Sequence, residues 1–204
     1  MKEALPGVVQ VTGKYVKAAG LTLAKAFQEY PVSVFFEPDP VKRRKTQPGM
    51  FRDLIRTLGP EAMVYGTSPG MEGVAVWVLM DKSKGEPKHK RSFRDWLESL
   101  HPDVEKIKKR QGFMDFSRGI RDRVMPERYW YLQLLGVDPE HQGKGLSTIL
   151  LKPMLELAAK QGLPCFLETQ RQKNVAFYGH FGFVMADEGT IPNGDVYSWA
   201  LVKK

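Results

Sequence analysis

The sequence predicts one domain of mixed α and β structure over residues 1–204. Stretches with the apolar spacing of helices alternate with short runs of branched and aromatic residues, which are typical of strands. A strand, a glycine turn, a helix and a second strand follow one another between Tyr129 and Thr169, which predicts a right-handed crossover. With 204 residues, of which 42% are hydrophobic, the chain can bury one sizeable core or two small ones.

The N-terminal part of the chain is expected to form two helices and three short strands. The expected helices cover residues 14–30 and 41–58, and the expected strands cover residues 6–13, 63–67 and 73–80. Pro31 ends the first helix, and two further prolines predict a rigid loop over residues 35–40. Residues 66–70 match the G-x-S-x-G pattern of hydrolase nucleophiles, but a strand follows them instead of a helix, so we interpret them as a hairpin loop.

The C-terminal part repeats the alternation of helices and strands. A loop is expected over residues 81–91, which are charged and contain Gly85 and Pro87. Helices are expected over 92–100 and 103–110, with a less regular helical segment on to Arg123. A strand over 129–139 leads through a turn into a helix that begins at Leu146. The remaining elements are a strand over 165–169, a helix over 174–181 ended by Gly182, and strands over 183–188 and 196–202.

The composition excludes several functional classes. The only cysteine, Cys165, lies in an apolar run, so an internal disulfide and a two-cysteine zinc site are excluded and a buried thiol is expected. The four histidines lack metal-ligand spacing, and we predict no metal. We find no signal peptide and no apolar stretch near the roughly 18 residues of a membrane span, which predicts a cytoplasmic protein without a membrane partner.

The net charge of +8 fits a solvated basic surface, an anionic cofactor or a nucleic-acid partner. The basic stretches at 41–45 and 82–128 do not interleave regularly spaced aromatic residues, as a single-strand binder would. Nucleic acid is therefore not expected as a partner.

Residues 142–147, with the sequence Gln-Gly-Lys-Gly-Leu-Ser, form the strongest functional signal in the chain. They stand at a helix start, where backbone N–H groups are unpaired and the helix dipole favours negative charge. The two glycines let a ligand approach the backbone closely. The P-loop pattern and the dinucleotide fingerprint both fail here, because Asp138 and Thr148 occupy positions that need glycine. The turn predicts an anion site, with phosphate as the expected anion.

Two motifs in this order resemble the GNAT superfamily of acyl-CoA N-acyltransferases. Gln142-x-x-Gly145-x-Ser147 is similar to the pattern Arg/Gln-x-x-Gly-x-Gly/Ala, with serine as a departure at its last position. The helix from Asn174 to Phe183 is similar to the family's Asn-then-Phe-Tyr-x-x-x-Gly-Phe helix. The runs 136–146, 166–169 and 26–31 look most like the puromycin N-acetyltransferase branch, whereas 82–128 does not match. The resemblance implies a mixed, mostly antiparallel central sheet flanked by helices, with one parallel strand pair splayed for acetyl-CoA.

The resemblance also implies where the cofactor binds. Backbone N–H groups of the turn would hold the coenzyme A pyrophosphate, and the edge of the preceding strand would pair with the pantetheine arm. One N–H of that edge would face the thioester carbonyl and stabilise an oxyanion. Gly136 is interpreted as a bulge that opens this strand from its neighbour. The expected cofactor-binding residues are Leu135, Gly136, Val137, Gln142, Gly143, Lys144, Gly145, Leu146, Ser147, Asn174 and Tyr178.

Tyr178 and Glu168 are the candidate catalytic residues. In the family, the tyrosine that matches Tyr178 protonates the departing thiolate, and the alternative is an aromatic side chain that only packs on the sheet. Glu168 is the candidate general base, directly or through water, and a buried position would raise its pKa towards neutrality. The alternative is a structural carboxylate satisfied by the backbone or by a basic residue. Asn174 is expected to contact the cofactor, to cap its helix, or to do both.

These residues predict an acetyl-CoA-dependent N-acetyltransferase that moves an acetyl group to a small-molecule amine by direct attack. Residues 129–188 would form the cofactor-binding core, and residues 31–58 and 82–128 would supply the acceptor side. No covalent enzyme intermediate is expected, because Cys165 lies in a strand. Two alternatives stay open: a coenzyme A-binding regulatory module without turnover, and a basic nucleic-acid-binding protein. The acceptor amine is not identified by the sequence, and a homodimer is also left open.

Overall fold

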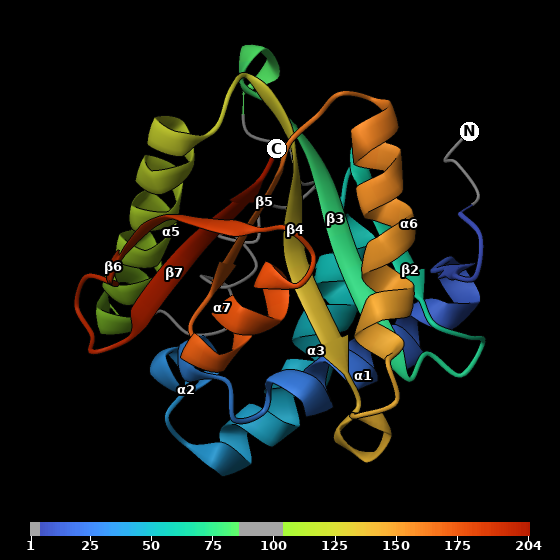
Figure 1. Ribbon diagram of the computed structural model, residues 1–204. Helices are drawn as coiled ribbons and strands as arrows, with labels where there is room; N and C mark the ends of the chain where they lie inside the picture. The colour runs from blue at the N-terminus through green and yellow to red at the C-terminus, as the bar shows by residue number, and fades with distance from the viewer. Residues whose placement is uncertain (1–4, 86–103) are drawn as a thin grey trace.

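The computed structural model describes residues 5–85 and 104–204, which form a seven-stranded sheet flanked by helices (Figure 1). The strands are β1 (Val9–Gln10), β2 (Ala62–Gly66), β3 (Gly73–Asp81), β4 (Arg128–Val137), β5 (Cys165–Thr169), β6 (Val184–Thr190) and β7 (Tyr197–Lys203). Their order in the sheet is β1-β2-β3-β4-β5-β7-β6, and β4 and β5 form a parallel pair in an otherwise antiparallel sheet. The predicted mixed, mostly antiparallel sheet is confirmed.

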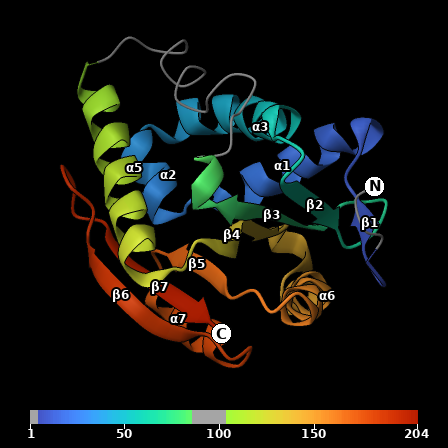
Figure 2. The same cartoon turned by 90° about the horizontal axis from the view of Figure 1, so that it is seen from above.

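Helices cover both faces of the sheet. They are α1 (Val16–Phe27), α2 (Pro31–Phe36), α3 (Pro40–Thr57), α5 (Val104–Val124), α6 (Leu146–Lys160) and α7 (Gln172–Gly179). Seen from above, α1 and α3 lie on one side of β2, β3 and β4, and α6 lies on the other (Figure 2). Among the described residues, no helix is both long and apolar enough to cross a membrane.

The side chains of β5 alternate between two apolar clusters, one on each face of the sheet. Cys165 and Leu167 belong to the apolar cluster that includes the buried face of α6, whereas Phe166 belongs to the cluster that includes Ile120 of α5. Because side chains alternate between the faces of a strand, the next residue, Glu168, faces α5. The alternation of three apolar residues therefore decides the direction of this carboxylate.

The parallel ladder between β4 and β5 is short, and this opens a gap in the sheet. It consists of three residue pairs, from Trp130↔Cys165 to Leu132↔Leu167, whereas the ladder between β4 and β3 continues to Val137. The last residues of β4 therefore keep their hydrogen bonds to β3 but not to β5. The splayed parallel pair expected from the sequence is present at this point.

The bulge expected at Gly136 is wrong. The register between β3 and β4 shifts between Val76 and Trp77, and the β4 residue left without a partner is Gln133, while Gly136 pairs with Val74. Gly136 is required for another reason. A Cβ atom there would lie 2.9 Å from the Cβ of Ala26 in α1, so only glycine allows this close packing of helix on strand.

Other expectations differ in their boundaries. The rigid loop expected over 35–40 is shorter, because α2 covers Pro31–Phe36; proline suits the first turn of a helix, where its missing N–H has no acceptor. The two helical segments expected between 103 and 123 form one helix, α5. The helix expected over 92–100 lies outside the described residues. The hairpin loop over 66–70 is confirmed, because β2 and β3 pair antiparallel on either side of it.

Candidate functional site

The turn after β4 is open and lacks a side-chain cap. A short 3-10 turn, Pro139–His141, follows β4, and α6 then begins with Gly145 as its N-cap residue and no side-chain hydrogen bond to the helix start. Gly143 and Gly145 have φ angles of 78° and 75°, which favour glycine, and a Cβ atom at either would meet nothing within 4 Å. Accessible, uncapped N–H groups at a helix start fit a phosphate-bearing ligand.

An ion pair fixes the beginning of this turn to α1. Lys25 Nζ lies 2.7 Å from Asp138 Oδ2, and the other carboxylate oxygen of Asp138 accepts a 3.2 Å hydrogen bond from the Glu140 N–H. The backbone N–H of Asp138 donates to the Glu72 carbonyl at 2.8 Å. Burial opposes ionisation of Asp138, but the hydrogen bonds from Lys25 and Glu140 outweigh it and lower the pKa. The protein's own contacts therefore hold this end of the turn.

The gap between β4 and β5 begins at Gln133 and Glu168, which follow the last paired residues of the two strands. The side-chain Oε1 atoms of both residues are buried and have no hydrogen-bond partner. Buried polar atoms in proteins are almost always paired. Two unpaired acceptors on neighbouring strands therefore fit a ligand that carries N–H or O–H donors.

Glu168 is half-buried and is held by α5 and β4. Its Oε2 atom accepts hydrogen bonds from Ser117 Oγ at 2.5 Å and from the Tyr131 hydroxyl at 3.2 Å. Arg121 Nη1 donates to the same Ser117 oxygen at 2.6 Å. Burial raises the pKa of Glu168, and these three neighbours only partly counteract it. One carboxylate oxygen is thus satisfied by the protein, whereas the other is not.

Tyr178 lies on α7, in the apolar cluster of the face opposite to Glu168. It is 8% exposed, and its ring packs edge-on against Phe177 and Phe183 at centroid distances of 5.1 Å and 5.9 Å. Burial, with a smaller effect of Tyr30, raises the pKa of Tyr178. The phenol is therefore protonated at neutral pH.

Three polar side chains meet at the end of β5. Asn174 Nδ2 donates to Thr169 Oγ1 at 2.9 Å, and the Tyr30 hydroxyl lies 2.9 Å from the same oxygen. The N-cap residue of α7 is Arg171, and it carries no side-chain cap. The expectation that Asn174 caps its helix is therefore wrong, because its side chain instead links α7 to β5.

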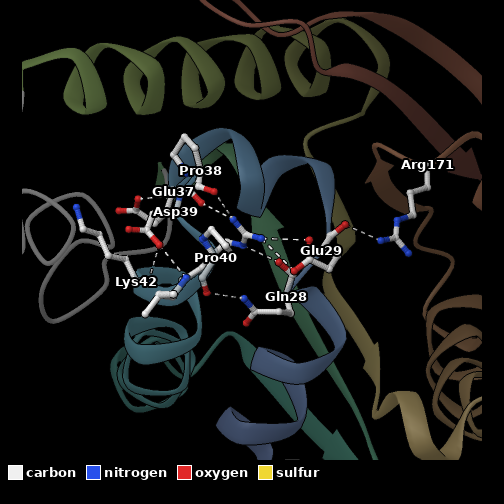
Figure 3. Close-up of polar contacts among 10 residues, drawn as sticks. Gln28, Glu29, Glu37, Pro38, Asp39, Pro40, Lys42 and Arg171 are labelled. Carbon is white, nitrogen blue, oxygen red and sulfur yellow. Dashed lines mark hydrogen bonds and ion pairs between the residues drawn. The ribbon is translucent and has the colours of Figure 1, made fainter.

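The turn between α1 and α2 is tied to the same end of β5 (Figure 3). Arg171 Nη2 donates to the Glu29 carbonyl at 2.7 Å, and its guanidinium lies 5.2 Å from the centre of the Tyr30 ring. Arg43, which is 2% exposed, pairs with the Glu29 carboxylate at 3.0 Å. It also donates to three backbone carbonyls, those of Gln28, Glu37 and Pro38. This network holds Tyr30 beside Thr169.

The part of the chain that the structure describes contains one cysteine and no cluster of possible metal ligands. No group of three or more His, Cys, Asp or Glu side chains there is arranged to hold a metal ion. Cys165 is buried, and burial raises its pKa to about 12. A thiol with this pKa is not a nucleophile at neutral pH.

Comparison with known proteins identifies the family. A model of the acetyltransferase (GNAT) family matches residues 76–183, which is more than half of the chain. The chain belongs to this family. An uncharacterized N-acetyltransferase of Schizosaccharomyces pombe is 27% identical over 190 residues, which cover 86% of this chain and 73% of that relative. The GNAT resemblance is thereby confirmed, whereas the puromycin branch rests on the quoted motifs alone.

Solved structures share the GNAT fold over nearly the whole chain. A histone acetyltransferase HPA2 and related acetyltransferase from Corynebacterium glutamicum has a TM-score of 0.63 at 18% identity, covering 98% of this chain and 96% of that one. Arylalkylamine N-acetyltransferase 2 from Aedes aegypti has a TM-score of 0.61 at 15% identity, covering 96% and 97%. At these identities the likeness concerns the fold alone.

The sequence did not single out the partners of Glu168. Ser117 and Arg121 lie in the stretch 82–128, which carries no recognisable motif. Their four-residue spacing places them on one side of a helix, but many pairs in α5 share that spacing. The structure selects this pair because its side chains reach β5.

Proposed function

We propose that this GNAT protein transfers an acetyl group from acetyl-CoA to the amine of a small molecule by direct attack. The observation that carries the proposal is the separation of β4 and β5 after Leu132 and Leu167. An uncapped glycine turn follows one strand, and unpaired Oε1 atoms stand at the start of the gap. One domain, with its cofactor-binding core over 129–188 and acceptor-side elements over 31–58 and 82–128, would supply all of these parts.

The cofactor would be held by backbone rather than by charged side chains. N–H groups of residues 142–147 would bind the pyrophosphate, because the helix start has no cap; within this range the N–H of Gln142 also donates to the Pro139 carbonyl at 3.5 Å. The edge of β4 over Leu135–Val137 would pair with the pantetheine arm, because its ladder to β5 has ended. Asn174 would contact the cofactor while it bonds Thr169. Acetyl-CoA supplies the activated acetyl group when bound.

Two side chains would move protons. Glu168 would take a proton from the attacking amine, directly or through water, because its Oε1 atom has no protein partner. Tyr178 would donate a proton to the departing thiolate, because a tyrosine hydroxyl carries its proton at neutral pH. Each effect is typically worth about 100- to 10,000-fold in rate. The acceptor is expected to be a small amine, and the puromycin-branch motifs favour an aminonucleoside or an amino-acid amide.

The test is acetylation of an amine panel by the purified protein. Free thiol released from acetyl-CoA and the mass of the product are measured together. We expect thiol release that depends on an amine, with turnover lowered in Tyr178→Phe and Glu168→Gln while acetyl-CoA binding changes little. Tight acetyl-CoA binding without thiol release would favour a non-catalytic coenzyme A-binding module. Salt-dependent nucleic-acid binding that acetyl-CoA does not affect would favour the nucleic-acid alternative.

A matched pair of variants tests the cofactor site in the same experiment. Gly145 and Gly162 stand at opposite ends of α6, and both have positive φ angles and open space around a new Cβ. Gly145→Glu and Gly162→Glu therefore introduce the same charge with comparable backbone strain. Calorimetry should detect no acetyl-CoA binding to Gly145→Glu and unchanged binding to Gly162→Glu. Equal affinities for both variants would contradict the pyrophosphate assignment.

A further inference from the structure

The hydrogen bonds around Glu168 form a chain in which Arg121 donates to Ser117 and Ser117 donates to Glu168. Arg121 can only donate, so the Ser117 oxygen accepts from its Nη1 atom. The single hydroxyl hydrogen of Ser117 then points to Glu168 Oε2, which lies 2.5 Å away. The Tyr131 hydroxyl donates to the same Oε2 atom at 3.2 Å. The two hydroxyl donors therefore meet one carboxylate oxygen, and Arg121 acts on it through Ser117.

The two oxygens of Glu168 are consequently different. Oε2 is fixed by α5 and β4, whereas Oε1 is buried without a partner beside the gap. Ser117 is 3% exposed and Arg121 is 6% exposed, so bulk water does not replace this contact readily. Both residues lie on α5, one helical turn apart, and α5 thereby sets the orientation of a carboxylate on β5.

We propose that Arg121 and Ser117 are positioning residues that hold Oε2 of Glu168 and leave Oε1 as the atom that accepts the amine proton. This inference rests on the proposed function, because it presupposes Glu168 as the base. Ser117 and Arg121 also lower the proton affinity of Glu168. A donor to the ionised carboxylate favours that form, so Ser117 keeps the base deprotonated at a lower pH than burial alone would allow.

Within residues 5–85 and 104–204, the charged and titratable groups around Glu168 belong to few elements. Arg121 faces it from α5, and Tyr131 faces it from β4. On the other neighbouring strand, β7, the residue opposite Glu168 is Ala200. A substitution at Ser117 should therefore appear as a shift in the titration of Glu168.

The test compares Ser117→Ala with Ser198→Ala. Ser198 on β7 is also fully buried and also accepts a hydrogen bond, but its partner is Gln170 Nε2 and not Glu168. For Ser117→Ala, the acid-side inflection of kcat/KM against pH should rise by about one to two pH units, the effect of one hydrogen bond to a charged group. Activity should fall at least about tenfold on the acid side and recover at high pH. Ser198→Ala should keep the wild-type profile.

Tyr131→Phe provides an independent variant, because it removes the longer bond to Oε2 and should shift the same inflection upwards by less. The pKa of the amine is common to all variants and cancels in the comparison. Unchanged inflections in Ser117→Ala and Tyr131→Phe, with activity lost in Glu168→Gln, would overturn the positioning role alone. Full activity of Glu168→Gln would overturn the assignment of the base itself.

Discussion

The contact between α1 and β4 at Gly136 gives a prediction whose size follows from the structure. A Cβ atom at Gly136 would lie 2.9 Å from Ala26 Cβ, 3.1 Å from Leu23 Cδ2 and 3.3 Å from Phe27 Cε2. Carbon atoms pack at about 3.5–4.0 Å, so α1 must move away by several tenths of an ångström. Ala26 has no rotamer that relieves the contact, because its side chain is a single methyl group.

The expected cost of Gly136→Ala combines two opposing effects. Overpacking of a well-filled interface costs about 1–3 kcal/mol. Alanine also lowers the conformational entropy of the unfolded chain, which stabilises the folded state by about 0.4–1 kcal/mol. The net loss in the free energy of unfolding should be about 1–2 kcal/mol. The same movement displaces the β4 edge that would hold the pantetheine arm, so acetyl-CoA affinity should fall as well.

Gly49→Ala is the matched control, since Gly49 lies within α3 and the nearest atom to a new Cβ is 3.9 Å away. It should stabilise the protein by about 0.5–1 kcal/mol, the helix preference of alanine over glycine. Urea unfolding followed by tryptophan fluorescence and circular dichroism measures both variants. A Gly136→Ala protein as stable as Gly49→Ala would refute the close-packing explanation for this glycine.

Two further predictions concern ion pairs. Arg43→Met should lower the free energy of unfolding by about 3 kcal/mol in urea titrations, because it leaves three carbonyls without their donor, whereas the exposed Arg44→Met should change it by less than about 0.5 kcal/mol. Lys25→Ala should destabilise most at neutral pH. The pKa of Asp138 is lowered in the folded state, so its stabilisation exists above the unfolded pKa and disappears as the pH falls through the folded value. Thermal unfolding curves of wild type and Lys25→Ala should therefore converge in acid, and a constant difference at every pH would contradict the role of this pair.

The sequence predicted the features that depend on local pattern. The turn at 142–147 was visible because glycine spacing at a strand–helix junction is a local signal, and β5 over 165–169 agrees at both ends. Long-range contacts carried no such signal. Ser117 meets Glu168 across 51 residues, and Gly136 is required by a helix more than 100 residues earlier. The bulge at Gln133 was missed because the aromatic and leucine-rich sequence of β4 does not reveal which residue lacks a partner.

The apolar pattern of β5 places the proposed base and the proposed acid on opposite faces of the sheet. Cys165 and Leu167 pack on the α6 face, and this turns Glu168 to the α5 face. Tyr178 approaches from the face of Leu167. In the proposed reaction, Glu168 takes a proton from the amine on one face and Tyr178 gives its own proton to the thiolate on the other, so no single residue must both accept and donate. A one-residue slip of β5 would exchange the faces and bring Glu168 to the side of Tyr178. The packing of three apolar side chains thereby keeps the proposed base and acid apart.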